Sequence, residues 1–318
     1  MKINPKITVA IGIRIRHQYL HQLLLDLKSQ TIKPDQYLIV ENVCEEQHYS
    51  QTKISNILKN NQHKYITTRG KNLAITRNIC LKQATGDILV FIDDDVRVPK
   101  KSIELIKNAF QKYPQAVGFS TRTKHPKTIM FHKFNDYWYN RGCMELKTPK
   151  LQPLAVSSMT AFNLKTINKQ QLTFDEKLND GEDIDFFCLL QTKHLPLFYL
   201  PNITTNHFFG NRSNLKIYLK RFYQYGQGVA LVSLKYPKTI NTDWLIPNRK
   251  LDLILFPIFF LKNVIKQVIL FKTDNKTFPI NLYPLTFLVY CFFNLGCLLE
   301  LNKTRKKIKH FFHHSSIY

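Results

Sequence analysis

Three consecutive aspartates, Asp93, Asp94 and Asp95, follow residues 88–92, the most apolar of the expected strands. Adjacent carboxylates repel one another, so a strand end tolerates three of them only when solvent or a cation compensates their charge. Side chains alternate along an extended segment, which predicts that Asp93 and Asp95 point to the same side. Two hard oxygen donors with an open coordination sphere suit Mg²⁺ or Mn²⁺ shared with a diphosphate. A solvated turn with helix-capping aspartates before Pro99 is the alternative interpretation.

A second group of acidic residues, Glu182, Asp183 and Asp185, comes directly after Gly181. An apolar run begins among them, which places the carboxylates in the first turn of a helix, where the helix dipole favours negative charge. A capped helix start fully explains Asp185. Glu182 or Asp183 could instead face a pocket and act as a general base, and the residues alone leave both interpretations open.

Basic residues and one histidine complete the candidates. Arg77 is one of several cations that flank the acidic strand end, and guanidinium groups match phosphate oxygens well. A solvated helix face is the more ordinary explanation for each of these cations. His207 becomes a metal ligand only if its segment folds back onto the aspartates, where a neutral imidazole could complete the metal shell.

The elements that must position these residues alternate between strand and helix over residues 7–100. Four strands are expected, at residues 7–13, 37–40, 64–67 and 88–92. Leucines at helical spacing predict a first helix at residues 20–27, and a second is expected at 72–84, closed by Gly86 in a left-handed conformation. Alternating strands and helices predict a mostly parallel sheet covered on both faces, with ligands at the carboxyl ends of the strands. Glu41 and Asn42 end the second strand, so they can share a pocket with the aspartates.

The composition narrows the class of protein. The chain has 318 residues, with 46 Lys plus Arg against 22 Asp plus Glu and a net charge of +24. A hydrophobic content of 44% excludes a disordered chain, and a mean hydropathy of −0.24 excludes a polytopic membrane protein. The charge predicts anionic partners, which are nucleic acid, acidic lipid headgroups or phosphorylated substrates.

The C-terminal part has a different composition. Residues 251–271 are apolar apart from a narrow polar stripe, residues 282–299 carry no charge, and residues 303–309 are strongly basic. We expect a domain over residues 1–230, with halves of about 1–120 and 121–230, and a helical, membrane-associating appendage over residues 231–318. Lys262 and Lys266 would lie at the headgroups, with the first helix in the membrane interface. A buried helical hairpin is the alternative, and whether residues 282–299 span a membrane stays open.

Taken in order, these motifs resemble the inverting, family 2-type glycosyltransferases, which have a GT-A fold. The family pattern has an apolar first strand, a second strand ending in an acidic pair (Glu-Asn in this chain), a Gly…Ala-x-x-Arg-Asn helix, a Gly-Asp strand ending in Asp-x-Asp, and a Phe-Asp-Glu…Glu-Asp segment. The matching residues here are 7–13, Glu41-Asn42, Gly70 with Ala74, Arg77 and Asn78, Gly86-Asp87, Asp93 with Asp95, and Phe174-Asp-Glu with Glu182-Asp183. The Gln-x-x-Arg-Trp motif of processive members is absent, so one sugar per encounter is expected.

The resemblance implies an α/β, Rossmann-like GT-A domain that moves a sugar, most often from a UDP-sugar, to a hydroxyl of a glycan or lipid-linked acceptor. It assigns Asp183 as the general base, with Glu182 as the alternate. It assigns the metal, Mn²⁺ or Mg²⁺, to Asp93, Asp95 and the more loosely matched His207. It assigns the donor to Ile11, Arg14, Glu41, Asn42, Arg77, Asp93, Asp94 and Asp95. Because nucleotide sugars are cytosolic, we expect the protein at the cytoplasmic face of the membrane.

Two other functions compete with glycosyl transfer. A nucleotidyltransferase would also use strand-end carboxylates, but it would release pyrophosphate and usually carries a glycine-rich phosphate loop, whereas the segment after Ile11 has one glycine. A nucleic-acid-binding protein is suggested by the charge alone, and the acidic triplet opposes that role. We therefore expect a nucleotide-sugar donor, a sugar acceptor and an anionic membrane as partners, and no nucleic acid.

Overall fold

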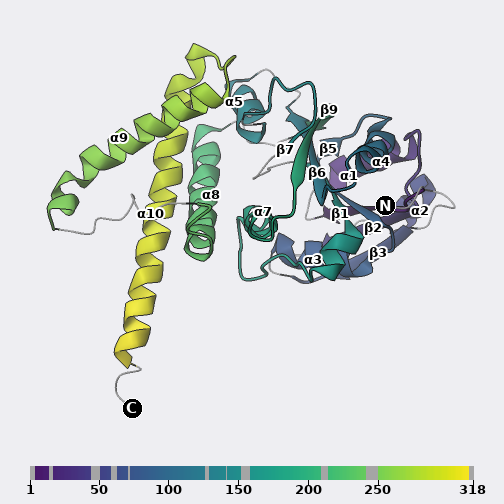
Figure 1. Ribbon diagram of the computed structural model, residues 1–318, viewed down its shortest axis with the longest axis horizontal. Coiled ribbons are helices and arrows are strands. Elements are labelled where there is room, and N and C mark those ends of the chain that lie inside the picture. Colours follow the sequence, from purple (N-terminus) through teal and green to yellow (C-terminus); the bar gives the residue numbers. More distant parts are fainter. Residues whose placement is uncertain are drawn as a thin grey trace. The chain divides into compact units, whose positions relative to one another are not determined.

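A computed structural model describes residues 4–13, 17–43, 51–58, 63–70, 72–125, 129–140, 142–151, 158–208, 214–240 and 250–314. The chain forms two compact units, residues 1–210 and 211–318 (Figure 1). The predicted domain boundary after residue 230 falls inside a helix of the second unit.

The first unit is built on a nine-stranded sheet with the order β3-β2-β1-β4-β8-β6-β9-β5 and with β7 beside β9. The strands are β1 (Ile7–Ile13), β2 (Gln36–Asn42), β3 (His63–Thr68), β4 (Ile88–Asp93), β5 (Val96–Arg97), β6 (Gly118–Lys124), β7 (Lys150–Leu151), β8 (Met159–Asn163) and β9 (Leu197–His207). Strands β1 to β4 run parallel, and Gly12 of β1 pairs with Val40 on one side and Asp93 on the other. Because β2 and β4 lie on opposite sides of β1, the strand order reverses there, which is where ligands bind in open α/β sheets.

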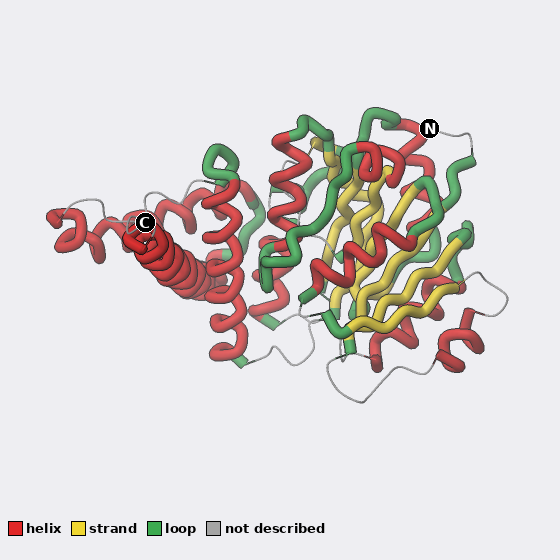
Figure 2. The backbone as a smooth tube through the Cα atoms, turned by 90° about the horizontal axis from the view of Figure 1, so that it is seen from below, coloured by secondary structure: helices red, strands yellow, loops and turns green. Residues whose placement is uncertain are grey.

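Helices cover both faces of this sheet (Figure 2). They are α1 (His17–Lys28), α2 (Gln51–Leu58), α3 (Leu73–Gln83), α4 (Ser102–Lys112), α5 (Met130–Tyr139), α6 (Leu164–Lys169) and α7 (Glu182–Thr192). Successive strand residues point to opposite faces. Val9 and Ile11 therefore join a core with α1, α2 and α4, whereas Ala10 joins a second core with α3, α6 and α7. The predicted α/β, GT-A-like architecture is confirmed.

Helix α1 shows why the local predictions succeed. Leu20, Leu23, Leu24 and Leu27 are all fully buried, as their spacing predicts for one helix face against a sheet. Burial of each leucine contributes about 1.5–3 kcal/mol. A twelve-residue helix is only marginally stable by itself, so most of the stability of α1 comes from this packing. The predicted strand at residues 7–13 forms with the same ends, and those at 37–40, 64–67 and 88–92 form with slightly different ends.

The prediction that Gly86 ends a helix in a left-handed conformation is wrong. Helix α3 ends at Gln83, its C-cap Ala84 is extended, and Gly86 is not among the described glycines with positive φ. A Cβ at Gly86 would lie 2.7 Å from the backbone nitrogen of Thr8. The absence of a side chain therefore serves the close approach of β4 to the start of β1, where the Gly86 amide donates to Thr8 Oγ1 at 3.0 Å.

The second unit is helical, with α8 (Leu215–Lys235), α9 (Lys250–Asp274), a 3₁₀ turn (Ile280–Leu282) and α10 (Tyr283–His314). Helices α8 and α10 meet at two glycines. A Cβ on Gly226 would collide with the carbonyl group of Phe293, and one on Gly296 would collide with that of Tyr223. The Cys297 thiol also donates to the Gly226 carbonyl oxygen at 3.0 Å, which adds a hydrogen bond to the close approach of the two helices.

Helix α9 packs on α10 through one face. Asn294 Nδ2 donates to Gln267 Oε1 at 2.7 Å, and the Phe271 ring lies edge-on to Tyr290. Within the described residues, one helical segment, Ile280–Thr304, is long and apolar enough to cross a membrane by length and composition, and 44% of its most apolar window is buried. The apolar C-terminal helix expected from the sequence is therefore present.

Candidate functional site

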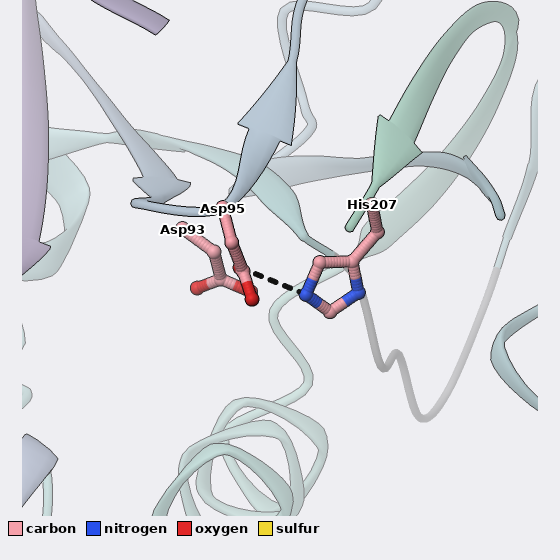
Figure 3. A group of neighbouring side chains, drawn as sticks. All are labelled: Asp93, Asp95 and His207. Carbon is pink, nitrogen blue, oxygen red and sulfur yellow. Dashed lines mark hydrogen bonds and ion pairs between the residues drawn. The ribbon is translucent and has the colours of Figure 1, made fainter. Parts of the chain in front are cut away.

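Three potential metal ligands converge where β4 and β9 end (Figure 3). Asp93 is the last residue of β4, Asp95 lies in the turn before β5, and His207 is the last residue of β9. One ligand atom from each residue lies within 4.8 Å of the other two, and His207 Nε2 is 2.9 Å from Asp95 Oδ1. The sequence condition for His207, that its segment folds back onto the aspartates, is met.

A short antiparallel pairing brings His207 to this position. In the register of β5 and β9, Val96 lies opposite His207 and Arg97 opposite Asn206. The Phe208 amide also donates to the Asp95 carbonyl oxygen at 2.8 Å. The imidazole therefore lies beside a carboxylate 112 residues away in the chain.

The three aspartates do not follow a continuous extended strand. Asp94 and Asp95 form a turn between β4 and β5, so simple alternation is not what brings Asp93 and Asp95 together. Asp94 is buried and lies outside the group of three ligands. The predicted convergence of Asp93 and Asp95 is present, but a turn produces it.

Aromatic and polar side chains surround the imidazole of His207. The rings of His125 and Tyr139 lie 5.5 and 5.7 Å from the His207 ring. Asp136 Oδ1 accepts from the His125 amide and lies 2.7 Å from His125 Nδ1. Burial lowers the pKa of His125, and His207 lowers it further, although Asp136 opposes the shift. A neutral His125 does not repel a cation at the neighbouring ligands, and sequence reasoning missed this support because no spacing links these residues.

The second acidic group is at the start of α7, after Gly181 in a left-handed conformation with φ 87°. Arg77 Nη1 donates to Glu182 Oε1 at 2.6 Å. Burial raises the pKa of Glu182 to about 7, because desolvation outweighs the attraction of Arg77 and Asp183 adds repulsion. Asp183 is half-buried, and its Oδ1 accepts from the Ile184 amide at 2.8 Å.

Arg77 links the two acidic groups electrostatically. Burial lowers the pKa of its guanidinium, but attraction by Glu182, Asp183 and Asp93 outweighs that effect and leaves the pKa raised. The guanidinium also lies 5.4 Å from the centre of the Phe174 ring. The charges of Asp93 and Asp183 therefore act on one cation, which is the arrangement expected if both face one site. Binding of donor phosphate by Arg77 stays a prediction.

Helix α3 holds the segment that precedes α7. Asn78 Nδ2 donates to the Phe174 carbonyl oxygen at 2.9 Å, and the Phe174 amide donates to Asn78 Oδ1 at 2.8 Å. Asn72, the N-cap of α3, donates through Nδ2 to the Glu176 carbonyl oxygen at 2.7 Å. Arg77 and Asn78 therefore contact neighbouring parts of the same segment. Arg77 binds the Glu182 side chain, and Asn78 binds the backbone of Phe174, which precedes α7.

Three of the other predicted donor residues belong to β1 and β2. Glu41 and Asn42 are buried, and the Tyr65 hydroxyl donates to Glu41 Oε2. The Ile11 side chain is fully buried in the core, and Arg14 lies outside the described residues. Contacts of these four residues and of Asp94 with a donor stay predictions.

The first half of the chain matches a known protein family. The family model described as "Glycosyl transferase family 2" matches residues 8–164, which span β1 to the first residue of α6. Residues 8–164 form a domain of glycosyl transferase family 2. This family membership confirms the resemblance seen in the sequence and makes the protein a glycosyltransferase by family and fold. No curated protein matches the chain.

Solved structures similar to this family 2 glycosyltransferase support the fold. A mannosyltransferase, PcManGT from Pyrobaculum calidifontis in complex with GDP-Man and Mn²⁺, has a TM-score of 0.61 at 14% identity, covering 93% of this chain and 87% of that one. S. aureus TarS 1–349 has a TM-score of 0.52 at 12% identity, covering 95% and 92%. GalNAc-T7 with UDP, GalNAc and Mn²⁺ has a TM-score of 0.54 at 12% identity, covering 72% and 48%.

Proposed function

We propose that this protein transfers one sugar, with inversion, from a nucleotide-sugar donor, most often a UDP-sugar in this family, to a hydroxyl of a glycan or lipid-linked acceptor. The observation that carries the proposal is the convergence of Asp93, Asp95 and His207 in a family 2 fold, with Asp183 and Asp93 both acting on Arg77. Two structurally similar glycosyltransferases were solved with a nucleotide or nucleotide sugar and Mn²⁺, which supports the same ligand classes here.

The residues at the end of β4 fit a divalent cation. Two carboxylates and one imidazole supply hard oxygen donors and a borderline nitrogen donor, a set that suits Mn²⁺ and accommodates Mg²⁺. Asp93, Asp95 and His207 would hold the ion. When bound, it supplies Lewis-acid stabilisation of the charge that develops on the departing diphosphate.

Asp183 is the better general base of the two candidate carboxylates. Glu182 is buried and its carboxylate is held by Arg77 at 2.6 Å, whereas Asp183 is half-exposed. A general base must come within about 2.6–3.2 Å of the hydroxyl it deprotonates, which requires an accessible carboxylate. Asp183 accepts the acceptor's proton as the acceptor oxygen bonds to the anomeric carbon. The bond to the diphosphate breaks on the opposite face, so the anomeric configuration is inverted.

Assay of a donor panel tests the reaction class. The purified chain is incubated with UDP-, GDP- and dTDP-sugars, with and without Mn²⁺ or Mg²⁺, and the released nucleotide is separated by chromatography. We expect a nucleoside diphosphate from one donor class and only with metal. Release of pyrophosphate would instead indicate nucleotidyl transfer, and metal-independent turnover would contradict the assigned ligands.

A set of three variants tests the base. Asp183→Asn should lower turnover about 10²–10⁴-fold and leave nucleotide affinity unchanged, because general-base catalysis contributes that much. Asp180→Asn is the matched control, since Asp180 is also half-buried beside Gly181. Glu182→Gln provides the discriminating comparison. A larger loss for Glu182→Gln than for Asp183→Asn, with both variants folded, would move the assignment to Glu182.

A further inference from the structure

Helix α9, drawn in light green in Figure 1, has one buried face and one exposed face by the burial of its side chains. Val264, Val268 and Phe271 are buried and recur at helical spacing, and they form the inner face. The opposite side is not polar, as it would be on a helix of an ordinary soluble protein. Its large apolar side chains are all more than one-third exposed: Ile258, Phe259, Leu261, Ile265, Ile269 and Leu270. We call these six residues, together with Lys262 and Lys266 among them, the α9 face.

The neighbouring part of the same unit adds further exposed apolar side chains. Ile280, in the turn before α10, is 81% exposed. Helix α10 carries a row at i, i+4, i+7 and i+11, which consists of Leu288, Phe292, Leu295 and Leu299. Single exposed apolar side chains are ordinary on a soluble protein, whereas a group of them on one helix face usually marks an interaction site with a protein or a membrane.

The charges on the α9 face indicate which partner it fits. Lys262 and Lys266 are exposed among the apolar side chains, and Lys272 and Lys276 follow at the end of the helix. Residues 257–299 contain a single acidic residue, Asp274. Apolar side chains mixed with lysines and almost free of carboxylates match a surface that is apolar beneath and anionic above, which is the headgroup region of an anionic bilayer.

We propose that the α9 face docks in the plane of an anionic membrane leaflet, with its six apolar side chains at the acyl boundary and its lysines at the lipid phosphates. The long lysine stems can pass along the apolar surface while the ammonium groups stay in the headgroup layer. An orientation across the bilayer would carry Lys262 and Lys266 into the hydrocarbon, which is unfavourable. The proposal goes beyond glycosyl transfer and uses no residue of the first unit, and location at the cytoplasmic leaflet stays a prediction.

Vesicle sedimentation tests the charge requirement. The full chain is mixed with phosphatidylcholine vesicles containing or lacking 30% phosphatidylglycerol. We expect binding mainly to the anionic vesicles. The double variant Lys262→Gln with Lys266→Gln should weaken that binding about thirtyfold, because each lysine near an anionic surface contributes roughly 1 kcal/mol. Equal binding of the wild type to both vesicles, or an unchanged double variant, overturns the proposal.

A matched pair of variants tests the apolar requirement. Ile269 on α9 is 55% exposed, and Ile217 on α8 is 54% exposed in the same unit. Ile269→Asp should reduce vesicle binding by at least about tenfold, whereas Ile217→Asp should leave it unchanged. Equal effects of the two substitutions would show that the α9 face is not the docking surface. Both sites are exposed, so both variants should fold, which circular dichroism checks.

Two further measurements separate the remaining alternatives. Phe259→Trp should give fluorescence that is quenched by lipids brominated near the headgroup end of the acyl chain and not by those brominated near the bilayer centre. Central quenching would indicate a spanning helix and contradict the in-plane orientation.

Sedimentation velocity without lipid should show a monomer, and a dimer abolished by Ile269→Asp would assign the face to a second copy. Nucleotide affinity should be unchanged in every variant, so failure here leaves the glycosyltransferase proposal standing.

Discussion

The acidic group at the end of β4 and the acidic group at the start of α7 differ in the charge that surrounds them. Asp93 and Asp95 converge on each other and on an imidazole, whereas Glu182 already has a guanidinium partner at 2.6 Å. Converging carboxylates favour a cation, because the cation offsets their mutual repulsion. Arg77 already offsets the charge of Glu182, and the neighbouring Asp183 is half-exposed and accessible to an acceptor hydroxyl. The same residue types therefore suit metal binding in one place and proton transfer in the other.

The largest expected effect comes from removing a carboxylate at β4. Asp95→Asn should abolish metal-dependent nucleotide binding and lower turnover by about 10³-fold or more, because a bound metal contributes several kcal/mol of charge stabilisation. Calorimetric titration of nucleotide with and without Mn²⁺ measures the binding. If Asp95→Asn retains wild-type metal-dependent affinity, the distinction between the two acidic groups fails.

Removal of Arg77, which pairs with Glu182 at the start of α7, should lower the free energy of unfolding. The Arg77 and Glu182 side chains are 17% and 10% exposed, and removing one partner of a buried pair costs about 3–5 kcal/mol. Arg77→Gln should therefore lower the free energy of unfolding by about 3 kcal/mol in denaturant titrations. Arg97→Gln is the control, because Arg97 pairs with Asp26 but is 40% exposed, and about 1 kcal/mol is expected. Equal losses would show that burial does not distinguish the pairs.

Replacement of the imidazole should have a smaller effect on metal binding than replacement of a carboxylate. His207→Gln leaves Asp93 and Asp95 in place, so metal-dependent nucleotide binding should persist with weaker Mn²⁺ activation. The preference for Mn²⁺ over Mg²⁺ should also fall, since nitrogen ligands favour transition metals. Activation curves for the two ions measure both effects. An unchanged Mn²⁺ curve would remove His207 from the ligand set.

The smallest expected effect is a pH dependence at α7. Burial raises the pKa of Glu182 from its ordinary 4.5 to about 7, so between these values the folded chain holds a proton that the unfolded chain has released. Stability from this group is therefore full below about pH 4.5 and is lost as the pH rises through about 7. Unfolding titrations at pH 5 and 8 should show a smaller decline for Glu182→Gln than for the wild type.

Local patterns predicted the elements that carry the site. The leucine spacing of α1, the apolar strand before Asp93 and the acidic first turn of α7 all appear as expected, because periodicity, capping and strand ends depend on neighbouring residues. Contacts between distant segments could not be predicted. His207 meets Asp95 through the two-residue strand β5, which is too short to leave a pattern, and the partner of Glu182 is 105 residues away.

The glycine contact between α8 and α10 limits how the second unit can move. Because neither Gly226 nor Gly296 has room for a Cβ, a shift of one helix along the other by a single residue would place a larger side chain against backbone. Helix α8 therefore cannot slide gradually along α10, and the two helices must separate before they can pack in another register. A displacement of α10, for example on a lipid surface, should therefore move α8 together with it.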